Sequence, residues 1–338
     1  MKDKSIRLAH GGGGRLTKQI EELFAQKLQN SILAEKGDAA VLDLELQAGE
    51  RLAYSTDSFV VDPLFFPGGD IAHLAVCGTV NDLAAMGAIP KYLSLGVIIE
   101  EGFAIDQLEI IAESIASACA EAGVVIVTGD TKVVGRGHGS GIYINTSGIG
   151  VIPVDRKIGH MQIAENDAII ITGGLAEHGM AVMQARESLP FLVEIKSDAA
   201  PLSAMLESLF IGGLPIHAIR DATRGGLAAV LNEMAQKKSF DFLIEEKDIL
   251  VQPHVKSACD MLGLDPLEVA NEGKMVIFCP ADAAEPVISL LHANQYGRSA
   301  AIIGTVQPGG SGRVLMKTLS GGKRIVEMPL GEQLPRIC

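Results

Sequence analysis

The apolar positions of the chain alternate between helical and extended spacing, in the order typical of a mixed α/β domain. Within residues 15–30, apolar residues recur every three or four positions, which predicts an amphipathic helix. Runs rich in β-branched residues, bounded by Gly, Pro or acidic residues, predict strands over residues 38–44, 51–62, 91–102, 124–134 and 141–152. Helical spacing between them predicts helices over 68–88 and 106–123, the latter ended by Gly123. Residues 38–153 therefore form one predicted domain, preceded by a glycine-rich arm and helix over residues 1–37.

A second unit begins with a strand, a glycine turn and a helix over residues 166–186. Helical spacing follows the motif "DATRGG" at residues 221–226, and further strands are predicted over 240–246, 274–280 and 300–307. We therefore assign a second domain to residues 154–307. The stretch "PGGSG" at 308–312 predicts a flexible joint. Beyond it we expect a hairpin that turns at residues 320–322, and then an unstructured tail, so that residues 308–338 form a separate unit.

Composition and charge narrow the class of protein. The 338 residues carry 41 acidic and 28 basic side chains, a formal net charge of −13, which argues against nucleic-acid binding and suits divalent cations that hold a polyphosphate. No apolar stretch is long enough to span a membrane. The first residues lack the apolar core of a secretory signal, so we expect a cytoplasmic protein. Four cysteines lie in apolar patterns and are expected to be reduced core residues: Cys77, Cys119, Cys259 and Cys279. The fifth, Cys338, ends the chain.

A run of glycines before the first predicted helix is the first candidate site. Its backbone N–H groups are free to surround an anion, with the positive end of the helix behind them. The alternative is a disordered arm. No Walker A loop and no dinucleotide-binding GxGxxG after a strand occurs in the chain. The candidate anion-binding residues are His10, Gly11, Gly12, Gly13 and Gly14.

Four aspartates are placed where strands or turns end, although aspartate is a poor strand residue. They are Asp57, Asp82, Asp130 and Asp221, with Asn81 beside the second. Converging carboxylates would repel each other unless a cation lay between them, and Mg²⁺ with phosphate oxygens meets that need. The alternative for individual members is helix capping.

Two further polar residues stand near these acids. Lys132, two residues after Asp130, is expected on the same strand face, where its ammonium group suits a transferring phosphate or a substrate carbonyl. Glu272 and Lys274 interrupt the chain just before an apolar strand. The alternative for all three is an ordinary turn. Histidines are scattered, which argues against a transition-metal site.

In order and spacing, "STDSFVV", "GTVNDLAAMGA", "VTGDTKVV", "HGMAVM" and "DATRGGLA" resemble the PurM-like ATP-dependent superfamily. Within it, "GGDIAHLAVCGTVNDLAAMGAIP" and the final "PRIC" resemble the HypE family of carbamoyl dehydratases, which act in [NiFe]-hydrogenase maturation. Selenophosphate synthetases need a cysteine or selenocysteine near the glycine arm, whereas the first cysteine here is Cys77. Aminoimidazole ribonucleotide synthetases and thiamine-phosphate kinases have no use for a terminal thiol. Cys338 therefore separates the sister families.

The resemblance implies an α+β fold of two PurM-like domains, an N-terminal mixed α/β sheet domain and a C-terminal α+β domain with a flexible tail. It implies ATP-dependent dehydration of a carbamoyl group on Cys338 to a thiocyanate, which supplies cyanide to an iron centre. Asp57, Asp82, Asp130 and Asp221 would hold Mg²⁺ and, with Asn81 and the glycine arm, ATP. We expect Lys132 to activate the carbamoyl oxygen or phosphate, and Glu272 to be a candidate base.

The expected partners are a second copy of the chain, the carbamoyltransferase HypF as donor and the HypC–HypD complex as cyanide acceptor. A non-catalytic carrier that presents Cys338 remains the alternative from another class. Lipidation is disfavoured, because a prenylation signal places its cysteine four residues from the end.

Overall fold

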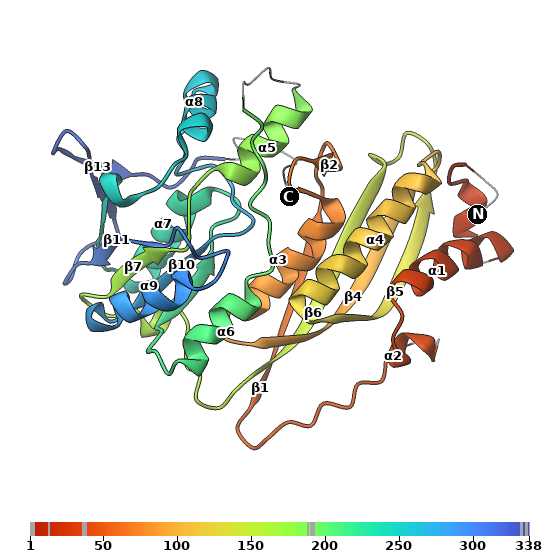
Figure 1. Ribbon diagram of the computed structural model, residues 1–338, viewed down its shortest axis with the longest axis horizontal. Coiled ribbons are helices and arrows are strands. Elements are labelled where there is room, and N and C mark those ends of the chain that lie inside the picture. Colours follow the sequence, from red (N-terminus) through yellow and green to blue (C-terminus); the bar gives the residue numbers. More distant parts are fainter. Residues whose placement is uncertain are drawn as a thin grey trace.

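The computed structural model describes residues 4–12, 14–35, 39–187, 189, 193–331, 334 and 337. Two sheets organise the chain, one in each domain (Figure 1). In the first domain the strands are ordered β1-β6-β4-β5, and in the second β13-β12-β9-β11-β7-β10-β8. A short pair, β2 (Phe65–Phe66) and β3 (Gly69–Asp70), lies between β1 and the first long helix. The predicted α+β class and the two-domain organisation are confirmed.

The first domain places two helices on one face of its sheet. The strands are β1 (Arg51–Phe59), β4 (Ile89–Glu100), β5 (Val125–Val134) and β6 (Ile142–Ile152), and only the β4–β5 pair is parallel. Helices α3 (Ile71–Ala85) and α4 (Ile105–Ala122) cover the sheet in Figure 1. Asp70 caps α3 by accepting the N–H groups of Ala72 and His73. Gly123, in the left-handed conformation with φ 71°, ends α4 as expected.

The first elements of the chain pack at the β5 edge of this sheet. They are the 3₁₀ turn η1 (Leu8–Gly11), α1 (Arg15–Lys27) and α2 (Ser31–Ala34). Helix α1 buries Ile20, Leu23 and Phe24, three of the residues whose spacing predicted it. The strand predicted over residues 38–44 is wrong for the described residues 39–44, which form no strand on the way to β1. Their apolar residues alternate with polar ones, but Val41 is 72% exposed and finds no sheet edge.

The second domain is a sheet covered by helices on both faces. Its strands are β7 (Ala168–Ile171), β8 (Ala218–Asp221), β9 (Phe242–Glu245), β10 (Met275–Cys279) and β11 (Ala301–Val306). Helix α7 (Gly226–Lys238) packs in the core on one face, whereas α6 (Ser203–Ile211) and α9 (Ala284–His292) share the core of the other. Helices α5 (Glu177–Arg186) and α8 (Pro253–Leu262) complete the domain. Short 3₁₀ turns are η2 (His160–Gln162), η3 (Glu246–Asp248) and η4 (Ala281–Ala283).

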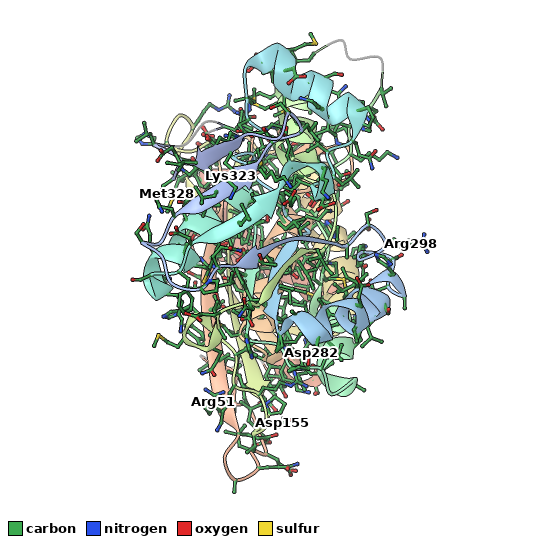
Figure 2. All side chains as sticks on the ribbon, turned by 90° about the vertical axis from the view of Figure 1, so that its left-hand side faces the viewer. Arg51, Asp155, Asp282, Arg298, Lys323 and Met328 are labelled. Atoms are coloured by element: carbon green, nitrogen blue, oxygen red, sulfur yellow. The ribbon has the colours of Figure 1, made fainter. Side chains whose placement is uncertain are left out.

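The predicted hairpin is present, but it belongs to the second sheet. Strand β12 (Val314–Lys317) pairs with β9, and β13 (Lys323–Val326) pairs with β12. The stretch before it is an ordered turn rather than a flexible joint, because Asp241 accepts the N–H groups of Ser311 and Arg313. The boundary predicted at residue 308 is therefore wrong, since the second sheet extends to Val326. Figure 2 shows Lys323 on this hairpin, far from Arg51 and Asp155 at the other end of the molecule.

The tail is not free where it is described. Leu334 and Ile337 are 6% and 4% exposed, and Ile337 forms an antiparallel bridge with Val61, just after β1. The prediction of an unstructured end is thus wrong for these two residues, because apolar side chains at 334 and 337 find a site between the domains. Cys338 itself lies outside the described residues. Among those described, the four other cysteines are buried and unpaired, as expected. The same residues contain no helix long and apolar enough to cross a membrane.

Candidate active site

Asp57 on β1 and Asp82 on α3 lie side by side, because the residue spacing along the strand matches the spacing along the facing helix. Ser55 and Asp57 share one face of β1, and Gly78 and Asp82 are one turn apart on α3. The Ser55 hydroxyl donates to Asp82 Oδ2 at 2.7 Å. A Cβ atom on Gly78 would lie 3.9 Å from Asp57 Oδ2. The pairing of residue 55 with 82 and of 57 with 78 places both carboxylates between strand and helix.

A third carboxylate comes from the second domain. Helix α3 packs against β8, which ends at Asp221. Burial, together with the nearby charge of Asp221, raises the pKa of Asp82 from 3.8 to about 6. Burial also raises the pKa of Asp57, although Ser58 N–H and the charge of Arg224 oppose it. Three carboxylates that disfavour one another's ionisation form a site that a divalent cation stabilises.

Asp130 does not join this group within one chain. In the sheet register Asp130 lies level with Gly96, Asn145 and Ser58, one residue beyond Asp57. Successive strand residues point to opposite faces, so Asp130 lies on the face away from α3. The expected convergence of all four aspartates therefore does not occur in a single copy.

Lys132 accompanies Asp130 on that face, which confirms the prediction that the two share one face of the strand. Its ammonium group contacts the Asp130 carboxylate at 2.8 Å, and both side chains are about two-thirds exposed. The same face, which we call the open face, carries exposed apolar residues: Leu52 (52%), Tyr54 (69%) and Ile98 (43%). A charged pair and an apolar patch thus share the side of the sheet that α3 and α4 leave uncovered.

The glycine arm lies beside β5, the strand that carries Asp130 and Lys132. His10 is fully buried in η1, and a Cβ atom on Gly11 would lie 2.9 Å from Val133 Cβ on β5. Gly11 is therefore required for close packing. Gly12 and Gly14 have open surroundings, which leaves them room to approach a ligand. Gly13 lies outside the described residues.

Asn81 has a structural role at the junction of the domains. Its side-chain amide donates to the Ala200 carbonyl at 3.0 Å and accepts the Leu202 N–H at 2.8 Å. It is 4% exposed. Both ends of the amide are bonded to the segment that leads into α6. Asn81 is therefore not part of the nucleotide site that we propose.

Glu272 stands at the centre of a buried charged cluster. It is 4% exposed, and among the described residues its Oε1 has no hydrogen-bond partner. Burial, followed by the charges of Asp198, Asp221 and Asp57, raises its pKa well above the ordinary value. Such a carboxyl group is a stronger base than an exposed glutamate and has one oxygen free for a substrate.

Lys274 balances part of this charge. Its ammonium group lies 3.0 Å from Asp198 and 3.4 Å from Glu177. Burial would raise the pKa of Asp198, but the ammonium group of Lys274 lowers it below its ordinary value. Asp198 also accepts the N–H groups of Glu272 and Gly273, which fixes the loop that carries Glu272.

Several members of the site were not predicted from the sequence. Asp198 lies in a loop, Arg224 in a turn and Glu177 at the start of α5, and no spacing along the chain links them to Glu272. Arg224, within the "DATRGG" motif, lies near enough to lower the pKa of both Asp57 and Glu272 below what burial alone would give. The one signal in the sequence for Arg224 was its position in the same motif as Asp221.

The donor set fits Mg²⁺ only in part. Carboxylate oxygens are the ligands this hard cation prefers, and Asp57 and Asp82, whose pKa values are raised mainly by burial, each feel the nearby charge of Asp221. Within the described residues, however, no three His, Cys, Asp or Glu side chains are arranged to hold an ion alone. Any Mg²⁺ here would take its remaining ligands from phosphate and water.

Comparison with known proteins places this site in a family. Residues 36–152 match the N-terminal domain, and residues 164–317 the C-terminal domain, of the AIR synthase related proteins. The chain is 46% identical to the carbamoyl dehydratase HypE of Azotobacter vinelandii, and the similarity covers all of this chain and 98% of that protein. It is 44% identical to that of Escherichia coli K12, over 99% of each chain.

Solved structures agree. The crystal structure of the hydrogenase maturation protein HypE in complex with ATP superposes with a TM-score of 0.94, at 44% identity over 98% of this chain and 100% of that one. A thiamine-monophosphate kinase from Stenotrophomonas maltophilia, at 16% identity and a TM-score of 0.66 over 92% and 97% of the two chains, shares the fold alone. The chain thus belongs to the HypE family of carbamoyl dehydratases.

Proposed function

We propose that this protein uses ATP to dehydrate a carbamoyl group carried on the sulfur of Cys338. The observation that carries the proposal is the position of Ile337, which is buried at the junction of the two domains and bridged to Val61. That junction also holds Glu272 and the three aspartates. A chain whose penultimate residue is seated there delivers its last residue to the acid cluster.

The proposed reaction turns the carbamoyl oxygen into a phosphate leaving group. The carbamoyl oxygen attacks the γ-phosphorus of ATP, the bond to the β-phosphate oxygen breaks, and ADP leaves. One N–H proton passes to a base, which gives an S-bound imidate phosphate. The second N–H proton then leaves, the carbon–oxygen bond breaks, and phosphate departs with the electron pair. The product is S–C≡N, with ADP and phosphate, and the carbamoyl oxygen ends in phosphate.

We assign the phosphates and Mg²⁺ to Asp57, Asp82 and Asp221. Bound Mg²⁺ would neutralise phosphate charge and relieve the repulsion among these carboxylates. Arg224 is the positive side chain on hand for the transferring phosphate. Glu272 is the proposed base, supported by its raised pKa and its unpartnered Oε1.

We further propose a homodimer formed through the open face. Leu52, Tyr54 and Ile98 give that face an apolar area that pairing of two sheets would bury. Asp130 and Lys132 would then enter the site of the second copy, which accounts for their position on the opposite face from Asp57. Mixing Asp82→Asn with Lys132→Ala protein tests this, because only a shared site restores activity in mixed dimers.

We also propose the partners and location that the family suggests. One related structure is a HypE–HypF complex, which supports HypF as the source of the carbamoyl group. The HypC–HypD complex is the proposed cyanide acceptor, and the cytoplasm the proposed location. A passive carrier of groups on Cys338 is the competing function, but it gives no reason for the buried carboxyl group of Glu272 with its raised pKa.

The decisive test follows the oxygen atom. Protein carbamoylated with a heavy oxygen isotope is mixed with ATP and Mg²⁺, and the released phosphate is examined by mass spectrometry. The heavy oxygen is expected in phosphate, and Cys338→Ala protein should release none. Heavy oxygen found only in water would contradict activation by phosphorylation.

A further inference from the structure

The buried side chain of His178, on α5, contacts the backbone of the tail. Its Nε2 lies 2.5 Å from the Ile337 carbonyl oxygen, and its Nδ1 lies 2.8 Å from the Ser197 hydroxyl oxygen. A carbonyl oxygen only accepts, so Nε2 must carry the proton that is donated to Ile337. The ring is fully buried, which lowers its pKa and keeps it neutral. In a neutral ring with a proton on Nε2, Nδ1 is an acceptor.

Ser197 fixes that tautomer. Its hydroxyl oxygen accepts the Ala199 N–H at 3.1 Å, which leaves the hydroxyl proton to be donated to His178 Nδ1. The Ser197 N–H donates to the Pro67 carbonyl at 2.8 Å, so the serine is itself held by the first domain. Phe66 packs edge-on against the ring at 5.5 Å between centroids. The imidazole therefore has one orientation and one donor direction.

The tail is held from both domains at this point. Val61 of the first domain bridges Ile337, and His178 of the second domain bonds its carbonyl. Leu334 packs near Gly179, one residue along α5, where a Cβ atom would lie 3.2 Å from the leucine side chain. The described part of the tail thus has two buried apolar side chains, one backbone bridge and one bond from a side chain. The bridge and the histidine bond together fix the last residues along the direction of the chain.

We propose that His178 is a positioning residue that bonds the penultimate carbonyl and so sets the distance between Cys338 and Glu272. The proposal rests on the proposed function, because it assigns the step that brings the carbamoyl group into register with the acid cluster. His178 recognises backbone and not a side chain, so it works on the carbamoylated and the free tail alike. Breaking the same bond releases the tail toward a partner.

The buried charged cluster connects the bonded carbonyl of Ile337 with the proposed base, Glu272. Ser197, which is bonded to His178, directly precedes Asp198 in the chain, and Asp198 holds the loop of Glu272 by accepting two backbone N–H groups. One chain of contacts therefore runs from the tail carbonyl to the proposed base. A tail shifted by one residue would lose the histidine bond and bring a different atom to Glu272.

The test measures how often the tail is docked, with no need for ATP or a carbamoyl group. Cys338 is labelled in native protein with a disulfide reagent; the four other cysteines are buried and react slowly. His178→Asn is too short to keep the donor at the Nε2 position, whereas His178→Gln retains it. A hydrogen bond of ordinary net strength corresponds to about five-fold in the equilibrium constant between the docked and the undocked tail. His217→Asn, at a histidine bonded to Asp167, is the control.

We expect His178→Asn to raise the labelling rate of Cys338 by up to about five-fold and to slow single-turnover dehydration, with ATP affinity unchanged. His178→Gln should restore both values, and His217→Asn should change neither. Equal effects of the Asn and Gln variants would show that the ring acts only by packing and would overturn the proposal, as would unchanged labelling in His178→Asn.

If His178→Asn does not fold, Ser197→Ala decides, because it removes the hydroxyl that fixes the tautomer; faster labelling supports the proposal, and wild-type labelling overturns it. Failure of the proposed function has a different signature. Labelling would respond to His178 as described, but the wild-type protein would lose no water on addition of ATP.

Discussion

Replacing Asp82 by asparagine should stabilise the nucleotide-free protein at neutral and alkaline pH. In the folded protein the pKa of Asp82 is about 6, against 3.8 for an ordinary aspartate. Between these values the folded state binds more protons than the unfolded state, so stability falls as pH rises through this range. About two pH units at about 1.4 kcal/mol each give a penalty of up to about 3 kcal/mol, fully present above pH 7. Asparagine carries no charge and keeps an acceptor for the Ser55 hydroxyl.

Calorimetry at several pH values measures this. For a chain of this size, 3 kcal/mol corresponds to a rise in midpoint of about 4 °C at pH 8, and the rise should vanish near pH 3.5. Asp130→Asn is the matched control, since that carboxylate is exposed and its removal should change the midpoint little. The wild-type protein should also gain stability from ATP with Mg²⁺, and Asp82→Asn should not. An Asp82→Asn variant that is no more stable at pH 8, or equally stabilised at both pH values, would refute the reasoning.

Three further changes test other parts of the account. Glu272→Gln should keep ATP affinity but abolish dehydration. In the wild type the dehydration rate should rise with pH in a range above that of an ordinary glutamate, because the base must be ionised and its pKa is raised. Lys132→Ala should lower the dehydration rate without changing stability, whereas the exposed Lys317→Ala should do neither; a full rate in Lys132→Ala would remove the lysine from the mechanism. Arg156→Ala should destabilise the protein by about 3 to 5 kcal/mol, since it breaks two 2.6 Å bonds to Glu207 at a buried site, and calorimetry should show a lower midpoint.

Much of the fold follows from local patterns. Strands β1, β4, β5 and β6 are where β-branched runs predicted them, and α4 ends at its glycine. Elements with weaker patterns were not predicted: α6, α8 and α9 are short helices, of which α6 and α9 share their core with the second sheet and α8 packs against α5. The strand expected before β1 failed because strand propensity needs a partner edge, and residues 39–44 have none in this chain.

The site was predictable to the extent that strand alternation and motif order encode it. Asp57, Asp82 and Asp221 meet as expected, but the face on which Asp130 points depends on the register of β5 against β4. That register includes a bulge near Leu93, which no propensity predicts. His178 was hidden for another reason. Its function depends on a contact with Ile337, 159 residues away in sequence.

The most direct test of the central claim is the mass of the C-terminal peptide of carbamoylated protein before and after addition of ATP and Mg²⁺. We expect this peptide to lose one water, with one ADP formed for each water lost and no change in any other peptide. An unchanged peptide mass in protein that binds ATP and carries the carbamoyl group on Cys338 would contradict the account and leave the passive carrier as the better description.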